Sequence, residues 1–271
     1  MKIISHRTVN IYKLCSIKNF RTICFFEWKA LLFDKIGLVR LIFLESMFYI
    51  LFFANSIARS NQSNFIENVP YLEFCFPGIL CLQSLRIFTQ IIYRSTLDRR
   101  WGLQSIKMIT GTGYLGYLLA YGFIYSIMFI LQGIILFPIA IWIGLFENNL
   151  LITNYFKAIS VGFVSSFAWS NIAIMISFFF KTYSSRDMFI SLTILPLTLL
   201  SPIFYSTDNS VYYVKILNYL NPLSYQVILL RKIMIEGISY LEILQCICIV
   251  SISFLLTLFT LKDAQYFQSE I

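Results

Sequence analysis

Few residues of this chain have the types and spacing that catalysis or metal binding needs. Catalysis requires a base beside a nucleophile, and a metal centre requires a cluster of ligands. The sequence has one histidine, His6, near its start, and no pair of its six cysteines has the spacing of a metal site. Cys246 and Cys248 would point about 200° apart on a helix. We therefore expect no catalytic, cofactor-binding or metal-binding residues, and we interpret the cysteines as small apolar filler.

The glycine-rich stretch Gly111–Gly116 does not resemble a phosphate-binding loop. Its sequence, GTGYLG, lacks the lysine and the preceding strand of such a loop. We interpret it as a flexible turn or a close contact between helices. The chain itself is therefore not expected to hydrolyse ATP.

The overall composition indicates that this protein is embedded in lipid. The chain is 58% hydrophobic and 13% charged, whereas a soluble domain is about 45–50% apolar and about 25% charged. A helix of about 20 apolar residues crosses a bilayer. Blocks of this kind fall at Gly37–Ala58, Tyr71–Tyr93, Tyr114–Leu145, Tyr155–Phe180, Met188–Tyr205 and Tyr240–Leu261.

These blocks predict an all-α integral membrane protein with six transmembrane helices. We expect a cytoplasmic N-terminal tail with an interface helix at residues 1–36. A six-span domain would follow at residues 37–261, and a cytoplasmic C-terminal tail at residues 262–271. Fifteen of the 21 basic residues then fall on the side of the two termini. Because cytoplasmic loops carry an excess of Lys and Arg, both termini are predicted to be cytoplasmic. The net charge of +8 reflects this bias and an attraction to anionic lipid rather than to nucleic acid.

Two apolar blocks differ from simple spans. Tyr114–Leu145 would be about 48 Å long as one helix, so we expect Pro138 to break it and leave an outer piece along the interface. The fifth block contains Pro196 and Pro202 and is followed by a polar turn. The moderately apolar stretch Val211–Gly237 is interpreted as one or two re-entrant helices in the outer leaflet, which either line a wet cavity or form a structural cap.

Polar residues inside the spans suggest contacts between helices. Glu45 and Arg86 lie at similar depths in the first two spans, roughly 10 Å from the cytoplasmic ends. Either they pair and fix these helices to each other, or Arg86 extends to the headgroups while Glu45 is protonated or faces water. The fourth span carries a stripe of small residues at helical spacing: Ser166, Ser170, Ala173 and Ser177. Such a stripe favours close helix packing over a polar substrate path.

Two cytoplasmic segments mix charged and apolar side chains. Residues 19–35, NFRTICFFEWKALLFDK, make an amphipathic helix in the membrane interface, or a plain juxtamembrane anchor. The basic loop after the second span carries Trp101, Leu103 and Ile106 among its charges. A short helix there would dock into a cleft on a soluble partner; a solvated loop is the alternative.

Five motifs follow one another along the chain. They are WKALLFDK with LIFLESMFYILFF, PYLEFCFPGIL (Pro70–Leu80), LDRRWGLQSI (Leu97–Ile106), TILPLTLLSPIFYS (Thr193–Ser206) and LNYLNPLSYQVILLR (Leu217–Arg231). In this order, on a six-span background, they resemble the ABC-2 type permeases, the membrane subunits of ABC exporters. The lipo-oligosaccharide and drug-export branch is the most similar. Ser46 and Pro202 depart from the family's usual proline and glycine, which weakens any transfer of a substrate from one branch.

The resemblance implies an ATP-driven exporter of the cytoplasmic membrane. Two permeases, identical or related, would work with two copies of an ABC ATPase, which uses ATP and Mg while this chain binds no cofactor. The coupling helix to the ATPase would comprise Asp98, Arg99, Arg100, Trp101, Gly102, Leu103 and Ile106. The exit region would include Asn221, Pro222, Leu223, Tyr225 and Arg231. The cargo would be an amphipathic drug, toxin or pigment, lipid or lipo-oligosaccharide.

Two other functions remain alternatives on the sequence alone. An ion-coupled secondary transporter or channel predicts an internal repeat of three plus three spans, and we find none in the sequence. A non-catalytic membrane scaffold is the other alternative.

Overall fold

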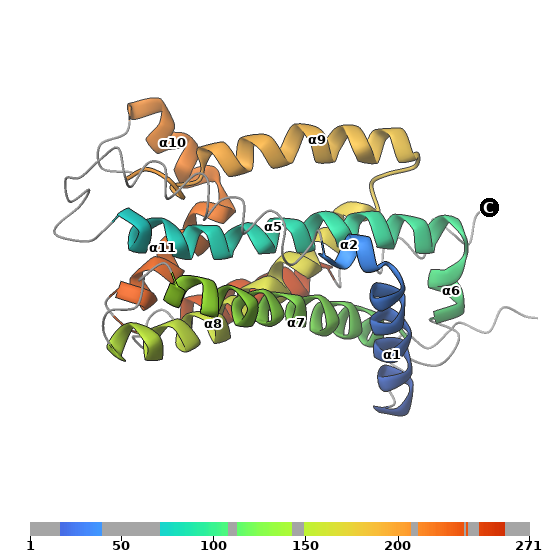
Figure 1. The fold of residues 1–271 in the computed structure, drawn as a ribbon. Coiled ribbons are helices and arrows are strands. Elements are labelled where there is room, and N and C mark those ends of the chain that lie inside the picture. Colours follow the sequence, from blue (N-terminus) through green and yellow to red (C-terminus); the bar gives the residue numbers. More distant parts are fainter. Residues whose placement is uncertain are drawn as a thin grey trace, which may run out of the picture.

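The chain folds into a bundle of helices (Figure 1). The computed structural model describes residues 17–39, 71–107, 113–142, 149–206, 211–235, 237 and 244–257. The labelled helices are α1 (Ile17–Phe33), α2 (Lys35–Val39), α5 (Tyr71–Arg100), α6 (Leu103–Lys107), α7 (Gly113–Trp142), α8 (Asn149–Ser177), α9 (Tyr183–Leu200), α10 (Tyr212–Leu220) and α11 (Pro222–Ile235). A further helix spans Leu244–Thr257. Every regular element in these ranges is a helix, as the sequence predicts.

Three helices are long and apolar enough to cross a membrane. They are α5 over Glu73–Arg100, α7 over Leu115–Trp142 and α8 over Ile152–Ser177. Helix α5 is central, because 83% of its most apolar stretch is buried within the chain, against 50% for α7 and 56% for α8. The first predicted span lies almost wholly outside the described residues. The total of six spans and the domain boundaries at residues 36 and 261 therefore stay predictions.

Helices α5 and α8 pack side by side in the same direction. The Ser84 and Ser166 Oγ atoms are 3.2 Å apart, and those of Ser95 and Ser177 are 2.9 Å apart. Both pairs are separated by 82 residues in the sequence, and two helices keep a constant offset only when they run parallel. All four residues of the predicted stripe are buried: Ser166, Ser170, Ala173 and Ser177. The prediction of close helix packing is confirmed.

Helix α7 is continuous through Pro138, so the predicted break at this residue is wrong. Proline removes one backbone hydrogen bond, but Leu136 and Ala140 on either side of it are both fully buried against the bundle. Tertiary packing on both sides therefore keeps the helix whole. At 30 residues α7 is about 45 Å long, and it accommodates a thinner hydrocarbon layer by tilting or by extending beyond it.

Helix α1 stands across the long axis of the bundle, at the end that carries α6 (Figure 1). Ile23, Glu27 and Leu31 form one stripe that is buried against the bundle. The opposite face exposes Phe25 and Phe26, at 57% and 60%. The predicted amphipathic helix is therefore present, and its aromatic outer face suits a position in the membrane interface.

Candidate functional site

The end of α5, the turn at residues 101–102 and α6 together form a segment, residues 99–107, that we call the α5–α6 turn. It presents two large apolar side chains to the outside. Trp101 is 69% exposed and Ile106 is 58% exposed. Gly102 has φ +70°, a conformation that residues with a side chain rarely adopt. An added Cβ at Gly102 would meet no atom within 4 Å, so the backbone conformation and not space calls for glycine. Gln104 is buried on the opposite side of α6, which fixes the outward direction of this turn.

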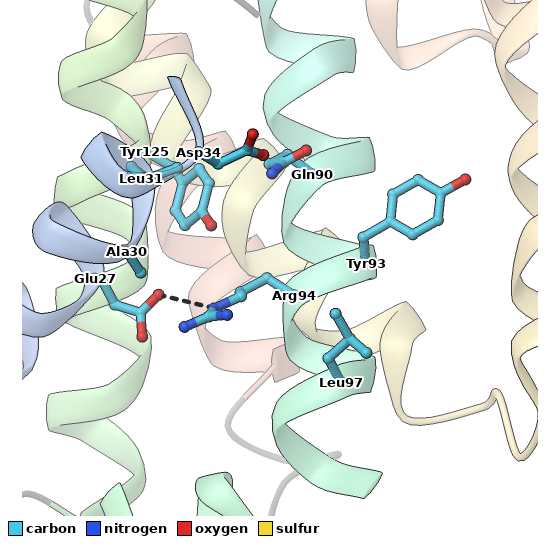
Figure 2. A pocket seen from close by; sticks show the side chains of 9 residues that line it. All are labelled: Glu27, Ala30, Leu31, Asp34, Gln90, Tyr93, Arg94, Leu97 and Tyr125. Atoms are coloured by element: carbon cyan, nitrogen blue, oxygen red, sulfur yellow. Dashed lines mark hydrogen bonds and ion pairs between the residues drawn. The ribbon is translucent and has the colours of Figure 1, made fainter. Parts of the chain in front are cut away.

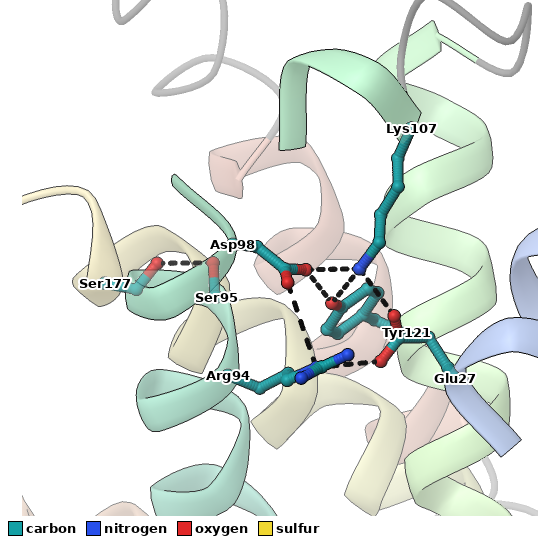
Figure 3. A network of polar contacts seen from close by, with 7 residues as sticks. All are labelled: Glu27, Arg94, Ser95, Asp98, Lys107, Tyr121 and Ser177. Carbon is teal, nitrogen blue, oxygen red and sulfur yellow. Dashed lines mark hydrogen bonds and ion pairs between the residues drawn. The ribbon is translucent and has the colours of Figure 1, made fainter. Parts of the chain in front are cut away.

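A buried network of charges holds this turn to helix α1 (Figure 3). The Lys107 Nζ lies 2.5 Å from Glu27 Oε1 and 2.5 Å from Asp98 Oδ2. The Arg94 Nε lies 3.4 Å from Glu27 Oε2 and 3.8 Å from Asp98 Oδ1. The Tyr121 hydroxyl donates to Asp98 Oδ2 and lies 3.0 Å from Lys107 Nζ. We call these five residues the Lys107 network.

The charges of the Lys107 network balance. Glu27 and Asp98 are 1% and 0% exposed, and Arg94 and Lys107 supply two positive charges. Taking charges out of water is favourable only when each finds a partner. Each of these four side chains therefore depends on the others, and together with Tyr121 they join α1, α5, α6 and α7 at one point.

Asp98 was predicted to face a partner protein, but the structure places it inside the chain. It belongs to α5, where it follows Arg94 by one helical turn and shares its inward face. The carboxylate is buried and engaged with Lys107 and Tyr121, so it is not available at the surface. Sequence reasoning missed Glu27, Lys107 and Tyr121 as one cluster. The available signal was a single acid, Glu27, in register with apolar residues on one face of α1.

The segment that follows α8 packs against the same end of the bundle. The Arg99 guanidinium donates to the Phe180 carbonyl. Arg186, at the start of α9, lies 4.3 Å from the ring centroid of Tyr93 on α5. Arg99 is therefore engaged within the chain. Arg100 is exposed, with its guanidinium 4.2 Å from the ring centroid of Tyr183.

Three of the sequence motifs meet at the opposite end of the bundle, around Arg231 of α11. The Arg231 Nε donates to the Phe74 carbonyl at 3.1 Å, and one terminal nitrogen donates to the Pro202 carbonyl at 2.5 Å. The guanidinium also stands 3.6 Å from the centroid of the Phe74 ring. The Tyr71 hydroxyl donates to the Phe204 carbonyl at 3.0 Å. One arginine thus joins α11 to the start of α5 and to the turn after α9.

Gly78 lets this turn approach α5 closely. A Cβ on Gly78 would lie 2.8 Å from Ile203 Cγ2 and 3.0 Å from Ile203 Cα. A side chain at this position would push the turn away from α5. The close approach explains why a glycine stands beside Pro77 in this motif.

The start of α11 is capped by Asn221. The Leu223 N–H donates to Asn221 Oδ1 at 2.9 Å, and Asn221 Nδ2 donates to the Leu197 carbonyl at 2.9 Å. Pro222 occupies the first helical position, where a missing N–H does no harm. Leu223 is fully buried, whereas Tyr225 is 52% exposed. Of the predicted exit residues, Asn221, Leu223 and Arg231 therefore hold the fold, and Pro222 and Tyr225 face outward.

Gln226 anchors α11 inside the bundle. Its Oε1 accepts a hydrogen bond from Trp169 Nε1 at 2.7 Å. Its Nε2 donates to Ser84 Oγ at 2.7 Å and to Ser165 Oγ at 2.8 Å. Every polar atom of the Gln226 amide group is thus engaged, although the side chain is buried. This cluster ties α11 to α5 and α8 in the bundle interior.

A comparison with protein families gives a match over most of the chain. Residues 18–235 match the family described as ABC-2 type transporter. The chain belongs to this family. A search of curated proteins finds no match. The protein is therefore an ABC-2 membrane permease, an integral multi-pass component of an ABC transporter, and ATP hydrolysis takes place in its partner subunit.

Family membership decides between the functions left open by the sequence. An ABC-2 permease works with an ABC ATPase, so an ion-coupled transporter and a scaffold are excluded. Within the described ranges of this permease, no group of three or more His, Cys, Asp or Glu could hold a metal ion. Glu45 lies outside the described residues, so its pairing with Arg86, a partly buried residue of α5, stays a prediction.

Proposed function

We propose that this permease exports an amphipathic cargo across the cytoplasmic membrane, and that its α5–α6 turn receives the motion of the ATPase. Two permeases, identical or related, would work with two ATPase copies, which bind the ATP and Mg. Both termini would be cytoplasmic, as the distribution of Lys and Arg predicts. In this orientation α1 and α6 lie at the cytoplasmic end, and α10 and α11 at the outer end.

One observation carries the proposed coupling role: Trp101 and Ile106 are exposed on a turn that buried polar contacts connect to other helices. Large exposed apolar side chains, tryptophan above all, are typical anchors of protein interfaces. The Lys107 network fastens the same turn to α1, α5 and α7. A push on Trp101 would therefore move the ends of several helices together instead of bending a loop. Arg100, Trp101, Gly102, Leu103 and Ile106 form the proposed contact, with Arg99 supporting it from within the chain.

The test is co-purification of the permease with its ATPase through a C-terminal tag. We expect a near-equimolar ATP-binding protein with the wild type and its loss with Trp101→Ala, at an unchanged melting temperature. Trp142→Ala is the matched control, because Trp142 is 80% exposed and ends α7. Full retention of the ATP-binding protein by Trp101→Ala would contradict the proposed contact.

The exit route is proposed to pass beside α10 and α11. Their outer surface exposes Tyr212, Tyr213 and Tyr219, at 71%, 74% and 73%, and tyrosine suits the boundary between apolar chains and polar headgroups. An amphipathic drug, toxin or pigment, lipid or lipo-oligosaccharide would meet such a surface favourably. ATP-dependent accumulation of a fluorescent amphiphile in inside-out vesicles tests the direction, and accumulation in right-side-out vesicles would contradict export.

A further inference from the structure

A cavity of about 180 Å³ lies between α1, α5 and α7, beside the Lys107 network (Figure 2). Ala30 and Asp34 line it from the side of α1, Gln90 and Arg94 from α5, and Tyr125 from α7. A site needs about 10–15 Å³ of such space to hold one water molecule, so the cavity has room for a polar group of several atoms. This volume suits the polar head of an amphiphile.

Arg94 offers hydrogen-bond donors to this cavity. Its side chain is 31% exposed, and its Nε lies 3.4 Å from Glu27 Oε2 and 3.8 Å from Asp98 Oδ1. Neither terminal nitrogen of Arg94 makes a hydrogen bond within the part of the chain that the structure describes. A guanidinium presents two such nitrogens in a planar fork that matches the oxygens of a phosphate.

Asp34 offers the opposite charge. Its Oδ1 accepts the N–H of Gly37 at 2.9 Å, and its side chain is exposed. The other acid of the cavity, Glu27, already has both oxygens engaged by Lys107 and Arg94. Asp34 is not part of the Lys107 network, so its carboxylate is not paired there. Arg94 and Asp34 are therefore the two charged groups of this cavity with hydrogen-bonding capacity left for a ligand.

The two charges select a ligand that carries both signs. A purely anionic head would lie against Asp34 and Glu27, and a purely cationic head would lie against Arg94. A zwitterion satisfies both. The cavity adjoins helix α1, whose outer face exposes Phe25 and Phe26, so the surrounding medium is the headgroup layer of the bilayer.

We propose that this cavity binds the headgroup of a phosphoethanolamine lipid, with the phosphate on Arg94 and the ammonium on Asp34. The primary ammonium has N–H donors for a carboxylate, whereas a choline head has none and calls for a cage of aromatic rings. Two aromatic residues line the cavity, Tyr125 of α7 and Tyr93 of α5, and the Tyr93 ring already has Arg186 4.3 Å from its centroid, so the lining does not form such a cage. A bound lipid would brace α1 against α5 on the side of the cavity opposite to the Lys107 network.

The test uses the complete transporter purified in detergent with an equimolar mixture of phosphatidylethanolamine, phosphatidylcholine and phosphatidylglycerol. Native mass spectrometry then counts the lipids retained by each permease. We expect one phosphatidylethanolamine per permease chain in the wild type. Ala30→Trp fills the cavity without replacing any charged side chain, and it is expected to abolish this retention. Phe26→Trp on the exposed face of α1 is the control. Equal retention by wild type and Ala30→Trp would overturn the site.

A second variant keeps the proposal testable if Ala30→Trp does not fold. Asp34→Asn preserves the shape of the side chain but removes the partner of the ammonium, so the preference for phosphatidylethanolamine over phosphatidylcholine should fall roughly tenfold. An unchanged preference would overturn the assignment of the ammonium. Soluble phosphoethanolamine that displaces the lipid at equal affinity would show that the ligand comes from the cytoplasm and not from the bilayer. Lipid retention requires no contact with the ATPase at Trp101, so this outcome is independent of the proposed coupling role.

Discussion

Removal of Lys107 should strongly destabilise the permease. Lys107→Met keeps the length of the side chain but leaves Glu27 and Asp98, 1% and 0% exposed, with one guanidinium between them. Breaking a buried charge pair by deleting one partner costs about 3–5 kcal/mol. For a chain of this size about 1 kcal/mol corresponds to roughly 2–4 °C in melting temperature. The variant is therefore expected to melt roughly 6–20 °C below the wild type.

A second substitution should restore most of the thermal stability that Lys107→Met loses. Glu27→Gln combined with Lys107→Met removes one charge of each sign and leaves Arg94 with Asp98, at 3.8 Å. The double variant is expected to melt several degrees above Lys107→Met alone, because buried charges interact and their effects do not add. Thermal unfolding of the four proteins of this cycle in one detergent is the assay. Strictly additive losses would show that Glu27 and Lys107 act separately, and a Lys107→Met protein that melts with the wild type would refute the reasoning.

Three further changes test other contacts by the same thermal assay. Gln226→Leu leaves the Trp169 indole N–H without its acceptor and should cost about 2–4 kcal/mol; wild-type stability would show that water replaces the amide. Gly78→Ala places a methyl group 2.8 Å from Ile203 Cγ2 and should cost about 1–3 kcal/mol, an expectation that a neutral substitution would contradict. Arg231→Lys retains the charge but not the planar fork on two carbonyls. It should cost about 1.5–3 kcal/mol, and equal stability would mean that charge alone matters there.

Local patterns predicted the elements of this fold better than the contacts between them. The amphipathic pattern of residues 19–35 gave a helix where it was expected, whereas the basic loop around Trp101 holds only the end of α5, a turn and the short helix α6. Asp98 and Arg100 are two residues apart at the end of α5, yet one is buried and the other exposed. Their difference depends on the rotation of α5 against α7, which a single sequence does not specify.

Distant pairs were the features that sequence reasoning could not find. Glu27 and Lys107 are 80 residues apart, and each stands in a segment whose charges are typical of a solvated surface. The prediction for Pro138 was wrong in the opposite sense, because it relied on the local sequence alone. The local rule predicted a break, but burial of Leu136 and Ala140 on either side outweighs one lost hydrogen bond. The five motifs gave the family, whereas the structure gave the reason for Gly78 and Arg231 within them.

The separation of Glu27 from Lys107 has a consequence for how the protein is made. Ribosomes add about 5–20 residues per second, so roughly 4–16 s pass between synthesis of the carboxylate and of its partner, 80 residues later. During this delay α7, the helix against which α1 mainly packs, has not been made, so the acid must stay hydrated. A helix with an aromatic face can rest on the membrane surface for that time, whereas a spanning helix would carry the charge into the lipid. The amphipathic surface of α1 therefore suits a segment that is synthesised early and packs against the other helices later.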